Sequence, residues 1–225
     1  MSRIYVLALT SHNYSSLVVD GRRIEFIKVE NVFAAIERRA APPTVSEAEL
    51  RSQHDVVSTI FDQTDDLLPV RFGAWIDRAE LSKVVTRQQE SIRDALQLVR
   101  GRAQMTIRFL APSGFQAEVR HSRRHPETGT EYLRTRRDAQ HRMPDEASAL
   151  KAAVRDLVVA ERVSPRSEGP AGLTRASLGP VASLYHLISR DAVAAYGAAT
   201  LPFRNATVTV SGPWPPFAFA PDPWL

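Results

Sequence analysis

The sequence predicts an α+β protein of two domains. Residues 1–112 are expected to form an antiparallel sheet with two helices, and residues 113–225 a helical domain with a small α/β unit and a proline- and aromatic-rich tail. Three observations lead to this prediction. Apolar and β-branched runs alternate with segments of helical periodicity in the first half. Capping patterns mark where its two helices begin. The length of 225 residues suits one large or two small domains.

The first elements of the chain are predicted to be strands. Ile4–Leu9 is a continuous apolar run, which is typical of a central strand. Asp20-Gly21 favours the positive φ angles of a tight turn, so residues 18–29 are expected to form a hairpin. Residues 32–36 are compatible with a strand or a helix, and a strand is favoured because Phe and β-branched residues frame them.

A helix is predicted over residues 46–62. Ser46 and Glu49 form the S-x-x-E capping box, which satisfies free N–H groups of the first turn. The predicted apolar stripe consists of Leu50, Val57, Ile60 and Phe61. His54 lies on this stripe, where a histidine is more often a hydrogen-bonded core residue than a catalyst.

The stretch Leu67–Gly73 follows that helix and is predicted to be a buried strand around which the chain is organised. Successive side chains of a strand point to opposite faces, so Arg71 and Phe72 are expected to face opposite ways. Pro69 has no N–H for a sheet ladder and marks the strand start or an edge. Gly73 allows a turn or a close backbone approach.

A long amphipathic helix is predicted over residues 78–100. Asp77 and Glu80 repeat the capping arrangement, and Gly101 stands where a left-handed residue ends a helix. Residues 105–110 alternate as a last strand. Two helices on one face of a largely antiparallel sheet, in this order, make a ferredoxin-like arrangement.

The second half begins with an Arg-rich segment, residues 118–142. It is interpreted either as a binding surface for phosphate or an acidic protein, or as a solvated helix face in which acidic residues offset the arginines. Pro144 and the acids after it predict the start of a helix. A strand over 181–188, a short helix over 191–199 and a strand over 206–211 are expected to follow.

The Pro-aromatic segment, residues 212–219, is predicted to be extended and polyproline-like, since proline fixes φ and removes donors. Either its aromatic side chains dock on the chain's own domain, or they offer a preformed apolar ligand to a partner. Docking is favoured, because an exposed apolar patch of this kind invites aggregation.

Composition excludes several classes of protein. The absence of cysteine rules out a disulfide scaffold and thiolate metal sites, and the histidines lack the spacing of a zinc site. No apolar run approaches the roughly 20 residues of a membrane helix, and no secretory signal is evident. The net charge of +4 permits an acidic partner without demanding one. A cytoplasmic protein without cofactor, bound metal or membrane anchor is expected.

Four short blocks occur in one order along nearly the whole chain: Leu50-Arg51-x-x-His54 with Val56-Val57, then Leu68–Gly73, then Gly129-x-x-Tyr132-Leu133-x-x-Arg136, then residues 212–219. Together they resemble the gas vesicle protein F and L family (GvpL/GvpF), whose last motif is Gly-Pro-Trp-Pro-Pro-Tyr-x-Phe. Phe217 replaces that tyrosine and removes one hydroxyl. The interaction candidates are Arg51, His54, Pro69, Arg71, Phe72, Gly73, Tyr132, Gly212, Pro213, Trp214, Pro215, Pro216, Phe217 and Phe219.

The resemblance implies a non-enzymatic accessory protein in the assembly of gas vesicles, the gas-filled protein shells that give microbes buoyancy. It implies a ferredoxin-like N-terminal domain followed by a helical, coiled-coil-like domain. It also implies contacts with the hydrophobic major shell protein and with other accessory proteins, at the vesicle in the cytoplasm. Self-association is compatible with it, and no nucleic acid or membrane partner is expected.

Two alternatives stand beside this interpretation. An RNA-binding module would suit a ferredoxin-like sheet, but strand 102–110 lacks the exposed aromatic pair that stacks bases. An enzyme would have to use His54 with Arg71 and a nearby aspartate, and a nucleophile is missing. A structural role is the simpler expectation: His54 bonds the backbone of the neighbouring strand, and Arg71 pairs with acids at the end of helix 46–62.

Overall fold

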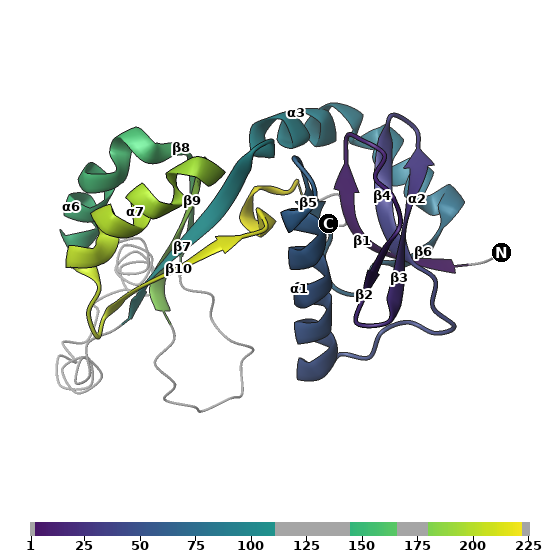
Figure 1. Cartoon of the computed structure of the whole chain (residues 1–225), viewed down its shortest axis with the longest axis horizontal. Coiled ribbons are helices and arrows are strands. Elements are labelled where there is room, and N and C mark those ends of the chain that lie inside the picture. The colour runs from purple at the N-terminus through teal and green to yellow at the C-terminus, as the bar shows by residue number, and fades with distance from the viewer. Residues whose placement is uncertain (1–2, 111–144, 166–179, 222–225) are drawn as a thin grey trace, which may run out of the picture. The chain divides into compact units, whose positions relative to one another are not determined.

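The computed structural model describes residues 3–110, 145–165 and 180–221 and divides into two compact units (Figure 1). Unit 1 comprises Met1–Gln104 and Pro213–Leu225, and unit 2 comprises Met105–Gly212. Unit 2 is therefore an insertion in unit 1, and the chain returns to unit 1 after residue 212. This division differs from the expected boundary at residue 112 and from the expected place of the Pro-aromatic segment in the second domain.

Unit 1 contains a six-stranded sheet in the order β2-β3-β4-β1-β5, with β6 also paired to β1. Its strands are β1 (Arg3–Thr10), β2 (Leu17–Val19), β3 (Arg22–Val29), β4 (Val32–Glu37), β5 (Leu68–Pro69) and β6 (Trp75–Asp77). The pairs are antiparallel, with Val6 opposite Ile36 and Ile4 opposite Ile76. The predicted hairpin is confirmed, because Asp20 and Gly21 have φ of 50° and 76° between β2 and β3.

Helices cover both faces of this sheet, which corrects the expectation of two helices on one face. The core beneath α1 (Glu47–Asp62) includes Tyr5 and Leu7, whereas Val6, on the opposite face of β1, is also fully buried. Helix α2 (Arg78–Arg87) contacts β3 and β6, and Figure 1 shows α1 and α2 on opposite sides of the sheet. A ferredoxin-like arrangement is therefore not confirmed.

The predicted helix over residues 78–100 is two helices. Helix α2 ends at Arg87 and α3 (Gln89–Val99) begins after Gln88, whose φ and ψ of −113° and 21° lie outside the helical region. Both predicted caps are confirmed, since the Ser46 side chain accepts from the Glu49 N–H and the Asp77 side chain from the Glu80 N–H.

Unit 2 contains a four-stranded sheet in the order β10-β7-β9-β8. Its strands are β7 (Arg102–Leu110), β8 (Val158–Pro165), β9 (Pro180–Ser189) and β10 (Val208–Trp214). Helices α6 (Asp145–Val154) and α7 (Val193–Thr200) share its core, which contains Phe109, Leu150, Ile188 and Tyr196. The described residues thus form a mixed α/β protein with antiparallel sheets and five α-helices.

The largest difference from the predicted fold is the sheet that β7 joins. Its alternation was recognised, and Met105, Ile107 and Phe109 are buried. However, β7 pairs within the second sheet rather than completing the first. The predicted helix after Pro144, strand 181–188, helix 191–199 and final strand are confirmed, whereas β8 was not predicted. The Arg-rich segment, Tyr132 and any coiled coil within it lie outside the described residues.

Two glycines give a matched test of backbone conformation. Gly101 has a φ of 65° and Gly197 lies inside α7, and an added Cβ would meet no atom within 4 Å at either position. Gly101→Ala should lower the free energy of unfolding by about 1 kcal/mol, because alanine is strained at positive φ. Gly197→Ala should raise it by about 0.5–1 kcal/mol through helix propensity. Urea unfolding of both variants checks these opposite signs, and equal signs would contradict the assignment.

Candidate functional site

The Pro-aromatic segment is anchored in unit 1. After β10 ends at Trp214, Pro215 and Pro216 are buried, and Phe217–Phe219 forms a 3₁₀ turn (η4) that contacts β5. Phe219 is 1% exposed, and the backbone N–H of Ala218 donates to Gln104 Oε1 at 2.8 Å. The segment is therefore docked on the chain's own unit, as favoured from the sequence, but as strand and turn rather than as a polyproline tail.

The structure brings His54 together with this segment. The His54 ring lies 5.3 Å from the Trp214 ring and 6.0 Å from the Phe217 ring, centroid to centroid. The rings of His54 and Phe217 are nearly parallel, with an interplanar angle of 24°. His54 is half-buried, and Phe217 is 40% exposed. Residues far apart in the sequence thus form one aromatic cluster.

The hydrogen bond expected from His54 to the strand backbone is made by its neighbour. Gln53, only 6% exposed, donates from Nε2 to the Val70 carbonyl at 3.1 Å and accepts at Oε1 from the Tyr5 hydroxyl. Burial raises the pKa of Tyr5, against the opposing effect of the Gly73 N–H. Sequence reasoning missed Gln53. Its spacing from Val56, Val57 and Ile60, which are all buried, was the available signal.

Leu50, assigned to the buried stripe of α1, is instead 46% exposed. Arg51 is exposed and pairs with Glu47 one turn earlier, at 2.6 Å. Such a surface pair contributes little to stability. Both side chains therefore belong to the outer side of α1 and not to the core.

The stretch around Pro69 is shorter as a strand than predicted. Only Leu68–Pro69 pairs as β5, because the chain turns at Gly73, where φ is 91°. Phe72 packs edge-on against Tyr5 with ring centroids 6.4 Å apart, and Arg71 is exposed. Both ends of the turn are hydrogen-bonded to β1, since the Val70 N–H donates to the Leu7 carbonyl and the Val6 N–H donates to the Ala74 carbonyl.

A second polar cluster lies in unit 2, where His186 and Tyr196 are buried and Glu161 and Lys151 are partly exposed. His186 is 1% exposed and its Nδ1 lies 2.7 Å from the Tyr196 hydroxyl, while its Nε2 lies 3.0 Å from Glu161 Oε2. Lys151 pairs with the same carboxylate at 2.5 Å. Burial lowers the pKa of His186 and outweighs the opposing effect of Glu161. Burial also raises the pKa of Tyr196.

The pKa of Glu161 is set by two opposing effects. Burial raises it, but the hydrogen bonds from Lys151 and His186 lower it more. The carboxylate therefore stays charged and holds the neutral histidine. This arrangement fixes β8, β9, α6 and α7 together, and its buried members do not face solvent as a catalytic group would.

Metal and membrane signatures are absent from the part of the chain that the structure describes. No three His, Asp or Glu side chains there are grouped to hold a metal ion. None of the helices in those residues has both the length and the apolar character needed to cross a bilayer.

Comparisons with known proteins give a family match and two similar folds. A family model described as "Gas vesicle synthesis protein GvpL/GvpF" matches residues 3–221. The fold is similar to the crystal structure of gas vesicle protein GvpF from Microcystis aeruginosa, with a TM-score of 0.70 and 12% identity over 98% of this chain and 100% of that one. It is also similar to GvpF from Anabaena sp. PCC7120, with a TM-score of 0.67 and 12% identity over 98% and 99%. A search of curated proteins gave no match.

Gln53→Ala should lower the free energy of unfolding by about 2–3 kcal/mol, because it leaves the Tyr5 hydroxyl and the Val70 carbonyl buried without this partner. Tyr5→Phe should cost about 1–2 kcal/mol, and the double variant less than the sum. His54→Ala, which removes ring packing but neither bond, is the neighbouring control. Urea denaturation measures all four, and an additive double variant would contradict a shared network.

Stability should fall as the pH drops below 6.5, the ordinary pKa of histidine. The unfolded chain then binds a proton that folded His186, whose pKa is lowered, does not bind. His186→Gln should flatten this part of the profile, whereas His12→Gln, at an exposed position of unit 1, should leave the contribution of His186 in place. Thermal unfolding across pH measures it. An unchanged slope in His186→Gln would show that the histidine is not responsible.

Proposed function

This chain belongs to the GvpL/GvpF family of gas vesicle proteins, and we propose that it is a non-enzymatic accessory protein that binds the major shell protein during gas vesicle assembly. In this role it nucleates or chaperones shell formation and contacts other accessory proteins of the vesicle. Its place is the cytoplasmic gas vesicle, in association with the shell.

One observation in the structure supports this proposal above others. Phe217 is 40% exposed although Pro216 before it and Phe219 after it are buried. The segment is anchored on both sides of an aromatic side chain that remains accessible. Half-exposed aromatic residues on a fixed backbone are typical anchors of protein interfaces, since they lose little conformational freedom on binding.

The alternatives have weaker support. The matching family is one of gas vesicle synthesis proteins, and the contacts of His54 are with the aromatic rings of Trp214 and Phe217. The RNA-binding alternative finds no support in the comparisons. The one aromatic residue of β7, Phe109, is 1% exposed and cannot stack on a base.

The test is co-expression of this chain, carrying an affinity tag, with the major gas vesicle shell protein. The wild-type chain should retain soluble shell protein after nuclease treatment. Phe217→Ser should lower the retained amount about tenfold, as expected for an interface anchor worth more than 1 kcal/mol. Leu201→Ser, at a residue 63% exposed in unit 2, is the matched control and should retain the wild-type amount.

Two results would overturn the proposal. In the first, the wild-type chain retains no shell protein at low or moderate salt. In the second, RNA co-purifies in its place before nuclease treatment. Equal retention by Phe217→Ser would remove the support that this residue gives.

A further inference from the structure

The outer side of α1 combines an apolar strip with a row of carboxylates. We propose that this surface, which we call the α1 platform (Leu50, His54, Asp55, Asp62, Trp214 and Phe217), is where a segment of the shell protein docks through large apolar side chains flanked by lysine or arginine. The inference rests on the proposed function and names the surface and the chemistry of its occupant.

The apolar strip follows from helical spacing. Leu50 and His54 are four residues apart and therefore lie one above the other on α1. Leu50 is 46% exposed, and the His54 ring continues the strip to Trp214 and Phe217. A strip formed by an aliphatic side chain and three rings offers area for apolar partner side chains.

The two carboxylates of the α1 platform favour a partner segment that carries positive charge. Asp55 and Asp62 are both exposed and seven residues apart, which places them on one side of α1, about 10 Å apart along its axis. Asp62 is in the last turn, where the helix dipole favours a cation, and that turn contains no basic residue. A lysine or arginine from a partner would compensate both the carboxylate and the dipole.

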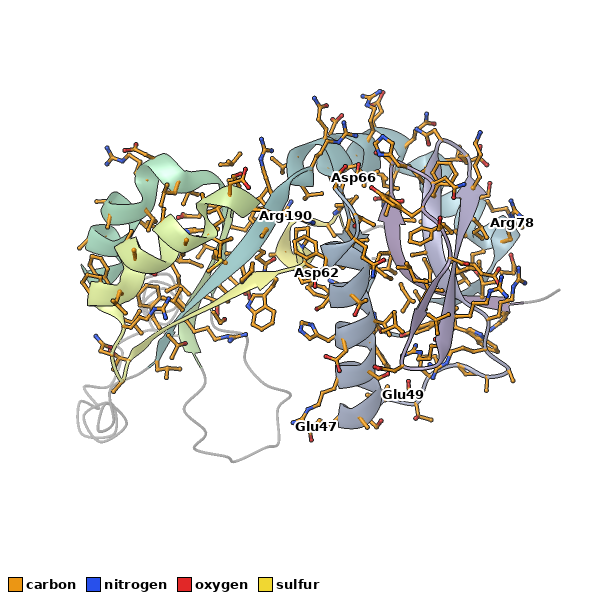
Figure 2. The ribbon with its side chains drawn as sticks, in the orientation of Figure 1. Glu47, Glu49, Asp62, Asp66, Arg78 and Arg190 are labelled. Carbon is orange, nitrogen blue, oxygen red and sulfur yellow. The ribbon has the colours of Figure 1, made fainter. Side chains whose placement is uncertain are left out.

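The acids at the other end of α1 differ from these two. Glu47 and Glu49 lie in the first turn, where the dipole favours carboxylates. Glu47 pairs with Arg51 at 2.6 Å, and Glu49 with Arg39 at 3.0 Å. Figure 2 shows Glu47 near the start of α1 and Asp62 near its end. The need for an outside cation is therefore greatest toward the end of the helix.

The platform is rigid before any partner arrives. Buried Val56, Val57 and Ile60 hold α1 on the sheet, and Gln53 bonds the Val70 carbonyl. On the other side of the rings, Pro215 and Pro216 are buried. A partner that docks here pays little to order the surface, which favours binding.

The first experiment tests the apolar strip with the same co-expression and capture of shell protein. Leu50→Glu should lower capture at least tenfold relative to wild type, because it places a charge among the apolar contacts. Val18→Glu makes the same kind of change at a residue that is 74% exposed on β2 and should change capture less than twofold. Thermal unfolding of each purified variant establishes that it is folded.

The second experiment tests the charges. Asp55→Asn with Asp62→Asn should lower capture about fivefold and weaken its dependence on salt, since a partner cation loses its attraction. Glu90→Gln with Asp94→Asn removes the same net charge from exposed positions of α3 and should leave capture and salt dependence unchanged.

The outcomes separate the two proposals. If the wild-type chain captures no shell protein, the proposed function and this inference both fail. If it does and the α1 platform variants capture as much as their controls, the inference alone is wrong. A second copy of this chain is the other candidate for the occupant of the α1 platform, and size-exclusion chromatography tests for it. If Leu50→Glu converts a dimer of the chain into monomers without lowering capture, the surface pairs two copies and the inference is overturned.

Discussion

Unit 1 depends on β1 being buried on both faces and paired along both edges. It pairs with β4 on one side and with β5 and β6 on the other, while α1 covers the face that carries Tyr5 and Leu7. Because β5 and β6 share this partner, the turn at Gly73 between them is tied to β1 at each end. That fixed turn presents the Val70 carbonyl to Gln53 and sets the position of α1. The aromatic cluster on His54 is built on this framework.

The features that were predictable from sequence depend on a few neighbouring residues. The caps at Ser46 and Asp77 need one side chain and an N–H three residues later. The Asp20-Gly21 turn and the left-handed Gly101 are set by local backbone preferences. Apolar alternation likewise identified β7. Such signals define elements, and they say nothing about which partner an element packs against.

The features that were not predictable depend on distant residues. Alternation in residues 105–110 is the same whichever sheet the strand joins, so β7 was assigned to the first sheet. The continuous apolar run of β1 was recognised as a central strand. However, helices were expected on only one face of the sheet, whereas Val6 and Leu7, on opposite faces of β1, are both buried, so both faces must be covered. Likewise, His54 and Gln53 are adjacent, and only the position of Val70 decides which of them bonds the strand.

The candidate site residues also divide into those that local sequence identified and those whose contacts depend on distant residues. The Pro-aromatic segment and His54 were singled out separately, and their contact appears only in the fold, since more than half of the chain separates them. Gln104 was not singled out at all, although its side chain anchors Ala218. Its place between the apolar residues Ala103 and Met105 was the available hint.

The insertion of unit 2 into unit 1 sets the order in which the protein is completed on the ribosome. Helix α1 and strand β5 are synthesised early, but Pro215, Pro216 and Phe219, which pack beside them, emerge only after all of unit 2. Translation proceeds from the N-terminus, so the aromatic cluster forms last. A chain that stalls within unit 2 lacks Trp214 and Phe217, so the surface that we propose for docking of the shell protein is incomplete until unit 2 has been synthesised.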